Sequence, residues 1–182
     1  MRLFAALSLS DDLRDRLAAL QDGLPEGKQV EWENFHLTLC FFGEVDGAAA
    51  EDLHAGLSAV DAPSFDLTLD GAGAFGGDRP RALYIAARPD PGLLHVQEKV
   101  EQAGRTAGVS IEAKKFTPHV TLMRFRPGRA SAPAAAKWLS HRSAFLAQPE
   151  TISSFQLYRS SLGRSGPIYE ELARYALAAP IT

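Results

Sequence analysis

Apolar residues recur with regular periods along the first half of the chain, and these periods predict its secondary structure. Residues 2–9 predict a strand, after which Ser10 begins a helix that ends at Gly23 and Pro25. A strand at 35–42, a helix at about 47–60 and a strand at 65–69 are expected next. A glycine- and proline-rich loop at 71–80 then leads to a strand at 82–87.

The second half of the chain repeats this alternation of helices and strands. Leucine, valine and alanine at helical spacing predict a helix from Pro91 to Ala107, and a strand follows from Phe116 to Phe125. Segment 127–134 predicts a loop that leads into a short helix near Trp138, and strands at about 151–158 and 168–177 close the chain. This order of elements predicts an α+β fold.

Two of the predicted strands carry the same short motif, a histidine and a threonine two residues apart. The motifs are His-Leu-Thr-Leu at 36–39 and His-Val-Thr-Leu at 119–122. Positions i and i+2 of a strand point to one face, so His36 shares a face with Thr38 and His119 shares one with Thr121. The repeated motif indicates a degenerate internal duplication. We therefore expect two α+β lobes, related by approximate two-fold symmetry, that bring both motifs to one groove.

The paired imidazoles and hydroxyls suit acid–base chemistry on a phosphate ester. An imidazole has an ordinary pKa of about 6.5, so one histidine can accept a proton while the other donates one. The threonine hydroxyls can hold phosphate oxygens, and the scheme requires neither a metal nor another cofactor. A single His-x-Thr triplet is more often a half-buried histidine bonded by a neighbouring hydroxyl. Two copies, each in a strand and each followed by leucine, favour the catalytic interpretation.

Length and composition limit the class of protein. The 182 residues are 46% hydrophobic and 23% charged, which is typical of a folded domain, and we expect one bilobal domain over 1–182. The net charge of −3 argues against a general binder of polyanions, so any phosphate site must be locally basic. The single cysteine, Cys40, excludes an internal disulfide framework and fits a reducing cytosol.

The N-terminal segment Met-Arg-Leu-Phe-Ala-Ala-Leu-Ser-Leu-Ser was compared with a secretion signal. Its apolar run is short, no Ala-x-Ala-like cleavage segment appears, and Asp11 and Asp12 follow at once. We expect this segment to be the first strand of a cytoplasmic protein that does not enter membranes.

The ordered set of motifs resembles the two-histidine phosphoesterases, specifically the RNA 2′,3′-cyclic phosphodiesterases historically named 2′-5′ RNA ligases. The likeness spans nearly the whole chain and rests on the following segments: Arg-Leu-Phe-Ala-Ala at 2–6, Glu-Asn-Phe-His-Leu-Thr-Leu at 33–39 leading to Phe-Gly-Glu-Val at 42–45, Pro80-Arg81, Phe116-x-Pro-His-x-Thr-Leu-x-Arg124, Leu-Tyr-x-Ser-Ser-Leu at 157–162 and Gly166-Pro-x-Tyr169.

This resemblance implies a fold, a substrate and residue roles. The fold is two pseudo-symmetric lobes, each an antiparallel β-sheet with helices on its outer face, flanking a central groove. The substrate is RNA with a 2′,3′-cyclic phosphate end, or a small cyclic nucleotide, which is hydrolysed to a 2′-phosphomonoester. His36 donates the proton to the leaving 3′ oxygen and His119 activates water, although the near-symmetry of the sequence leaves the reverse assignment open. Thr38, Thr121 and Arg124 contact the substrate.

Arg124 raises a geometric difficulty. Strict alternation from His119 places its side chain on the opposite face of the strand, so a bulge near Met123 is needed to return it to the face of the histidine. In the first motif, Phe41 stands at the corresponding position. The two halves of the site are therefore expected to be unequal.

Several other features were weighed against simpler interpretations. A basic cluster flanks the second motif and is either a solvated face or an attractor of RNA ends; it comprises Lys114, Lys115, Arg124, Arg126 and Arg129. Phe116 and Tyr169 could stack on a base, although core packing is the commoner role. Cys40 shares the His36 face by alternation and is expected to line the core or groove rather than to act as a nucleophile.

The glycine string Gly71-x-Gly73-x-x-Gly76 matches a dinucleotide-binding pattern. It leads into a strand rather than a helix, so no helix N-terminus is available for a pyrophosphate. His54, His95 and His141 lack metal-ligand spacing.

The sequence leaves two other functions open. The protein could join or cleave 2′-5′ linkages in the same groove, or it could be an RNA-end binding module with vestigial activity. We expect a monomer.

Overall fold

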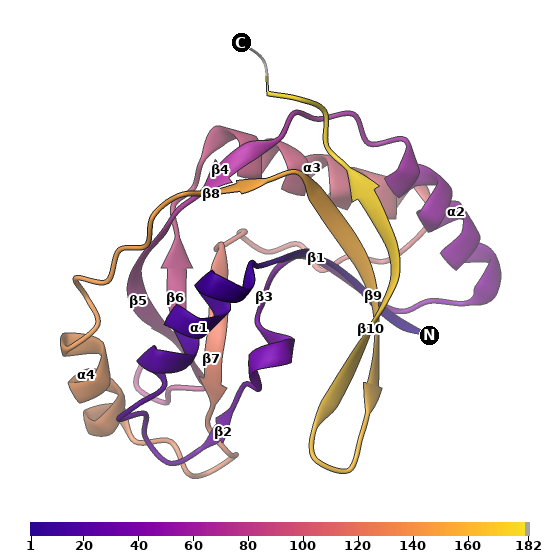
Figure 1. Cartoon of the computed structure of the whole chain (residues 1–182). Helices are drawn as coiled ribbons and strands as arrows, with labels where there is room; N and C mark the ends of the chain where they lie inside the picture. The colour runs from indigo at the N-terminus through magenta and orange to yellow at the C-terminus, as the bar shows by residue number, and fades with distance from the viewer. Residues whose placement is uncertain (181–182) are drawn as a thin grey trace.

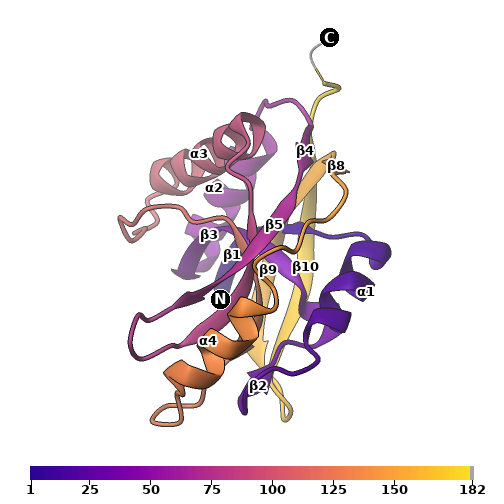
Figure 2. The same ribbon diagram turned by 90° about the vertical axis from the view of Figure 1, so that its left-hand side faces the viewer.

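The computed structural model describes residues 1–180 and places two four-stranded sheets side by side (Figures 1 and 2). The first sheet has the order β10-β9-β1-β3 and the second the order β2-β7-β6-β5. Every pairing within them is antiparallel. The strands are β1 (Arg2–Ser8), β2 (Lys28–Gln29), β3 (His36–Glu44), β5 (Leu69–Phe75), β6 (Ala82–Ala87), β7 (His119–Arg124), β9 (Ser154–Leu162) and β10 (Pro167–Ala176). A small third sheet pairs β4 (Phe65–Leu67) with β8 (Glu150–Ile152).

Four α-helices cover the sheets, and they begin where the sequence supplies capping side chains. Ser10 caps α1 (Asp11–Leu20), Asp46 caps α2 (Gly47–Ser58) and Asp90 caps α3 (Pro91–Thr106), each by accepting a backbone N–H bond. Ser131 caps the fourth helix, α4 (Ala132–Ser140), in the same way. The predicted α+β class with two antiparallel sheets is therefore confirmed.

Two helices, α1 and α3, each follow a strand of one sheet and contact the other sheet. The helix after β6, α3, lies against β3, where Gly104 allows close approach because a Cβ there would lie 2.7 Å from the Phe42 ring. The helix after β1, α1, ends against β7, where Gln21 donates a hydrogen bond to the Leu122 carbonyl. Trp138 of α4 donates a hydrogen bond to the Leu20 carbonyl, which joins α4 to α1. This exchange of helices fixes the two sheets relative to each other, and one hydrophobic core runs through both.

Two predicted elements differ from the structure, and two short elements were not predicted. The segment 71–80 was predicted as a loop, but its first half belongs to β5, because pairing with β6 holds even a glycine-rich strand in place. The strand predicted at 151–158 is divided into β8 and β9. The short strand β2 and a 3₁₀ helix at Trp32–Asn34 have too few residues to show a period and were missed.

Within residues 1–180, no helix is both long and apolar enough to span a bilayer.

Candidate active site

The four residues of the two His-x-Thr motifs line one groove of about 640 Å³ between the two sheets. β3 contributes His36 and Thr38, and β7 contributes His119 and Thr121. All four side chains are half-buried, whereas Leu37 and Val120 between them are fully buried in the core. The alternation predicted from the sequence is therefore present in both strands, and it brings the two motifs to one site.

Both histidines are held in the same tautomer by a backbone carbonyl two residues earlier, just before the strand begins. His36 Nδ1 lies 2.7 Å from the Asn34 carbonyl oxygen, and His119 Nδ1 lies 2.6 Å from the Thr117 carbonyl oxygen. A carbonyl oxygen only accepts, so Nδ1 carries the hydrogen in each ring. Nε2 is therefore the atom that can exchange a proton. In the neutral His36 ring, Nε2 accepts a hydrogen bond from the Thr38 hydroxyl at 3.0 Å.

Each motif strand contains a bulge directly after its threonine. In β3, Thr38 faces Ala6 and Cys40 faces Ala5, so Leu39 is the additional residue. In β7, Thr121 faces Tyr84 and Met123 faces Leu83, so Leu122 is the additional residue. Two consecutive side chains are buried in each case, and alternation then resumes with the opposite phase.

The bulges return Phe41 and Arg124 to the groove at corresponding positions of the two motifs. The predicted bulge near Met123 is confirmed, and it explains how Arg124 lies on the same side as His119. Arg124 forms no ion pair within residues 1–180, and Phe41 is 54% exposed. The groove therefore has a guanidinium beside one histidine and an aromatic ring beside the other.

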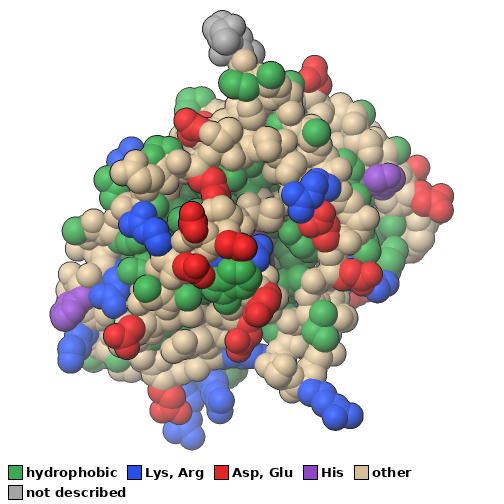
Figure 3. Space-filling view, viewed as in Figure 1, with side chains coloured by type: hydrophobic (Ala, Val, Ile, Leu, Met, Phe, Trp, Pro, Cys, Tyr) green, Lys and Arg blue, Asp and Glu red, His purple; other side chains and the backbone are tan. Residues whose placement is uncertain are grey.

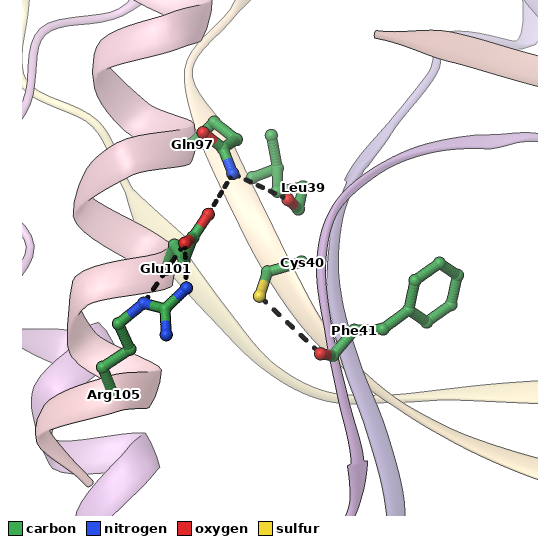
Figure 4. Close-up of polar contacts among 6 residues, drawn as sticks. All are labelled: Leu39, Cys40, Phe41, Gln97, Glu101 and Arg105. Atoms are coloured by element: carbon green, nitrogen blue, oxygen red, sulfur yellow. Dashed lines mark hydrogen bonds and ion pairs between the residues drawn. The ribbon is translucent and has the colours of Figure 1, made fainter. Parts of the chain in front are cut away.

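Cys40 does not follow the simple alternation that placed it beside His36. The bulge turns it toward α3, where it is 6% exposed and still lines the groove (Figure 4). Burial, together with the nearby charge of Glu101, raises the pKa of Cys40 to about 12. The side chain is therefore a neutral thiol near pH 7, as expected for a residue that lines a core or groove.

The local electrostatics keep both imidazoles neutral in the free protein. Burial lowers the pKa of His36 to about 4, and the charge of Arg124 contributes to this shift. Burial and Arg124 also lower the pKa of His119, against the opposing effect of its bond to the Thr117 carbonyl. A bound phosphate would offset both effects, because its negative charge favours the imidazolium form.

Aromatic rings surround each histidine, and the sequence alone did not identify most of them. His36 lies against Phe4 at 5.1 Å and edge-on against Tyr169 at 5.3 Å between ring centroids. His119 lies against Tyr84 at 5.1 Å and edge-on against Phe75 at 4.7 Å. Their strand positions in β1, β10, β6 and β5 show no special pattern in the sequence. Their role appears only when the strands are paired.

Gly73 makes room for the aromatic support of His119. Gly73 faces Tyr84 across the β5–β6 pair, and a Cβ at this position would lie 2.4–2.7 Å from three atoms of the Tyr84 ring. The glycine string that resembled a dinucleotide motif therefore belongs to a strand and its turn. Gly73 leaves space for the Tyr84 ring, which contacts the rings of both Phe75 and His119.

Replacing Gly73 with alanine is expected to lower kcat about 10-fold with little change in KM, because displacing Tyr84 misorients the His119 ring. The pKa of His119, followed by NMR, should rise because the ring becomes more hydrated. Gly47→Ala serves as the matched control, since a Cβ there has open space. A wild-type kcat in Gly73→Ala would show that this support is dispensable.

The basic residues of the groove differ in part from the predicted cluster. Lys114, Lys115 and Arg124 line it, whereas Arg126 and Arg129 do not. Lys28 of β2 and Arg81 before β6 also line it. Lys28 was missed because it lies near neither motif, and Arg81 was noted only as part of the family resemblance, without a role at the site. Figure 3 shows lysine and arginine gathered along the lower edge of the face, with acidic side chains over its middle. The charge is thus local, as the net charge of −3 requires.

Phe116 and Tyr169, the aromatic residues singled out from sequence, both line the groove and are half-buried. His54 instead bonds to the Tyr175 hydroxyl at 2.8 Å, and His95 and His141 are exposed. In the part of the chain that the structure describes, no three histidine, cysteine, aspartate or glutamate side chains gather as metal ligands would.

Comparison with known proteins agrees with this geometry. The sequence profile of the 2′-5′ RNA ligase superfamily matches residues 6–164. The RNA 2′,3′-cyclic phosphodiesterase of Aeropyrum pernix is 38% identical over 164 residues, covering 86% of this chain and 92% of that protein. The Escherichia coli enzyme of the same name is 29% identical over 180 residues, covering 97% of this chain and 96% of that protein.

Solved structures agree as well. Escherichia coli LigT complexed with 3′-AMP has a TM-score of 0.81 and 27% identity, covering 97% of each chain. A Thermus thermophilus protein has a TM-score of 0.81 and 30% identity, covering 98% of this chain and 99% of its own. The resemblance predicted from the paired motifs is confirmed, and the chain belongs to the 2′-5′ RNA ligase superfamily.

Proposed function

We propose that this protein is an RNA 2′,3′-cyclic phosphodiesterase that opens the cyclic phosphate to a 2′-phosphomonoester. The observation that carries the proposal is the matched pair of imidazoles. Each has Nδ1 bonded to the carbonyl two residues earlier in the chain, so each has Nε2 available at one groove. The relatives that bear this activity in their names support the choice of substrate. So does the complex of LigT with 3′-AMP.

In the proposed reaction, water attacks phosphorus in line with the 3′ oxygen. One neutral imidazole takes a proton from the water as the new P–O bond forms. The other, as imidazolium, protonates the 3′ oxygen as the P–O3′ bond breaks. The Thr38 and Thr121 hydroxyls and the Arg124 guanidinium hold the non-bridging oxygens, where negative charge increases in the transition state.

We assign the acid to His36 and the base to His119, following the family resemblance. The lowered pKa of His36 means that the acid is neutral in the free protein and gains its proton as the charged phosphate binds. In the imidazolium form, Nε2–H points at the 3′ oxygen, and the Thr38 hydroxyl, which no longer donates to Nε2, donates to a phosphate oxygen instead.

The kcat/KM profile is expected to be bell-shaped, with its maximum between about pH 4 and pH 6.5, because the free protein titrates with both imidazole pKa values lowered. The kcat profile should lie at higher pH, since the bound phosphate raises both values. Measuring initial rates from pH 4 to 9 at low and at saturating substrate checks this. A kcat/KM maximum above pH 7 would contradict it.

The proposed activity is tested by incubating the protein with 2′,3′-cyclic nucleotides and short cyclic-ended RNA in EDTA, followed by chromatography of the products. We expect 2′-phosphate ends, formed at the same rate with and without EDTA. Inhibition by EDTA would overturn the metal-independent mechanism. Binding without turnover would identify an RNA-end binding module, and 2′-5′-linked products would identify ligation as the main reaction.

We further propose that the protein is a cytoplasmic monomer built as one bilobal domain, because one hydrophobic core runs through both sheets and the single cysteine is a buried free thiol. Light scattering after size-exclusion chromatography checks the monomer. A dimer at micromolar concentration would contradict it.

A further inference from the structure

One end of the groove lies between β3 and α3 and has a composition unlike the rest. Cys40, Ile111 and Phe116 form apolar walls there, and Gln97 and Glu101 of α3 supply the polar groups. We call this region the α3 end of the groove. Figure 4 shows Gln97, Glu101 and Arg105 along one side of α3, facing Leu39 and Cys40 of β3. The proton-transfer chemistry described above uses none of these side chains.

The hydrogen bonds at the α3 end fix its polar groups as acceptors. Gln97 Nε2 donates to Glu101 Oε2 at 2.9 Å and to the Leu39 carbonyl at 3.5 Å. Both partners only accept, which identifies Nε2 as the amide nitrogen and leaves the amide oxygen of Gln97 outside both bonds.

The Glu101 carboxylate is held in place and ionised. Arg105 donates to Glu101 Oε1 through Nε at 3.2 Å and through a terminal nitrogen at 2.6 Å. The bonds from Arg105 and Gln97 lower the pKa of Glu101. Each carboxylate oxygen has lone pairs beyond the bonds already made. The α3 end therefore offers hydrogen-bond acceptors on the α3 side of the groove, held in place by these bonds and next to apolar side chains.

The α3 end lies within the reach of one nucleotide from the histidines. A regular strand rises by about 3.3 Å per residue, and the bulge at Leu39 shortens the step from Thr38 to Cys40, so the two residues lie less than about 7 Å apart along β3. Lys114 joins the two regions, because its charge lowers the pKa of both His119 and Cys40. A nucleotide whose cyclic phosphate lies between the histidines can thus place its base at the α3 end.

We propose that the α3 end binds the base of the nucleotide that carries the cyclic phosphate, and that it selects guanine. This inference rests on the proposed phosphodiesterase function. Guanine presents two adjacent donors, N1–H and the N2 amino group, which match a carboxylate and a neighbouring amide oxygen. Adenine and cytosine present one amino group beside a ring acceptor. Uracil presents one N–H between two carbonyl oxygens, which the acceptors repel.

The expected preference is large enough to measure. A wrong base leaves these acceptors without donors or sets its carbonyl oxygens against them, which disfavours its binding. We expect kcat/KM for 2′,3′-cyclic GMP to exceed that for 2′,3′-cyclic UMP by about 10- to 100-fold. The cyclic nucleotides of adenine and cytosine should fall between the two.

The test compares kcat/KM for the four cyclic nucleotides in the wild-type protein, Glu101→Gln and Glu98→Gln. Glu98 is exposed on the same helix and does not line the groove, so it is the matched control. Glu101→Gln replaces one acceptor oxygen with a donor. It should lower kcat/KM for the guanine substrate about 10-fold while changing the adenine value less than two-fold. Thermal melting of each variant shows that it is folded.

Titration calorimetry with 2′-GMP, 2′-AMP and 2′-UMP separates this proposal from the proposed function. Preferential binding of 2′-GMP that is lost in Glu101→Gln, without turnover of any substrate, would support the base site and overturn the hydrolase. Hydrolysis of all four substrates at equal kcat/KM would overturn the base site alone. An equal decrease in kcat/KM for all four bases in Glu101→Gln would also overturn the base site. Failure of the wild-type protein to bind any of the three nucleotides would overturn it as well.

Discussion

Replacing His36 or His119 with alanine is expected to lower kcat by about 10⁴-fold, at the upper end of what one proton transfer contributes. The two imidazoles act on the same phosphate, so removing both should cost little more than removing one. Both rings lie at the groove rather than in the fully buried core. The thermal unfolding midpoint of each variant should therefore stay near the wild-type value. His95→Ala, at an exposed position on α3, is the matched control.

The roles of the two histidines can be separated with an activated substrate. A p-nitrophenyl phosphodiester has a leaving group that departs without protonation, so the acid is no longer needed. If His36 is the acid, His36→Ala should retain most of the wild-type rate on this substrate while His119→Ala remains inactive. The reverse result would exchange the two roles. Equal loss in both variants would contradict a division into acid and base.

Replacing Arg124 with glutamine is the change with the next largest expected effect. Arg124 lines the groove at the bulged end of β7, and its charge acts on both histidines, so we expect its guanidinium to meet the developing negative charge. Loss of one such donor typically lowers kcat by about 10²- to 10³-fold. Arg129→Gln is the control, because Arg129 is exposed and does not line the groove. A decrease of less than five-fold in Arg124→Gln would exclude a role in the transition state.

The same variant tests the electrostatics of the site. The charge of Arg124 lowers the pKa of both His36 and His119, so its removal favours the imidazolium forms and raises both values. Both limbs of the kcat/KM profile should therefore move to higher pH in Arg124→Gln. NMR titration of the histidines in the free variant measures the same change without turnover. Unchanged histidine pKa values would show that Arg124 lies too far away to act on them.

Local sequence patterns were sufficient to predict the catalytic strands. Leucine or valine between the histidine and threonine of each motif places the polar pair on one face, and β3 and β7 show that arrangement. Repetition of the motif then predicted the shared groove. The bulge at Leu122 was predicted only because Arg124 required it, and the matching bulge at Leu39 was not predicted, since Phe41 made no comparable demand.

What the sequence did not reveal depends on pairing between distant segments. Tyr84 and Phe75 become the support of His119 only when β5 pairs with β6 and β6 pairs with β7. The hydrogen bonds from Nδ1 to the carbonyls of Asn34 and Thr117 involve the backbone, which leaves no signature in residue types. Lys28 reaches the groove because the two-residue strand β2 pairs with β7.

The central claim is that water attacks phosphorus opposite the 3′ oxygen of a 2′,3′-cyclic phosphate. Hydrolysis of a cyclic-ended RNA dinucleotide in ¹⁸O-water with EDTA, followed by ³¹P NMR, tests it most directly. We predict a single product, the 2′-phosphomonoester, with one ¹⁸O atom on its phosphorus. A 3′-phosphomonoester, or a product without the isotope, would contradict the mechanism.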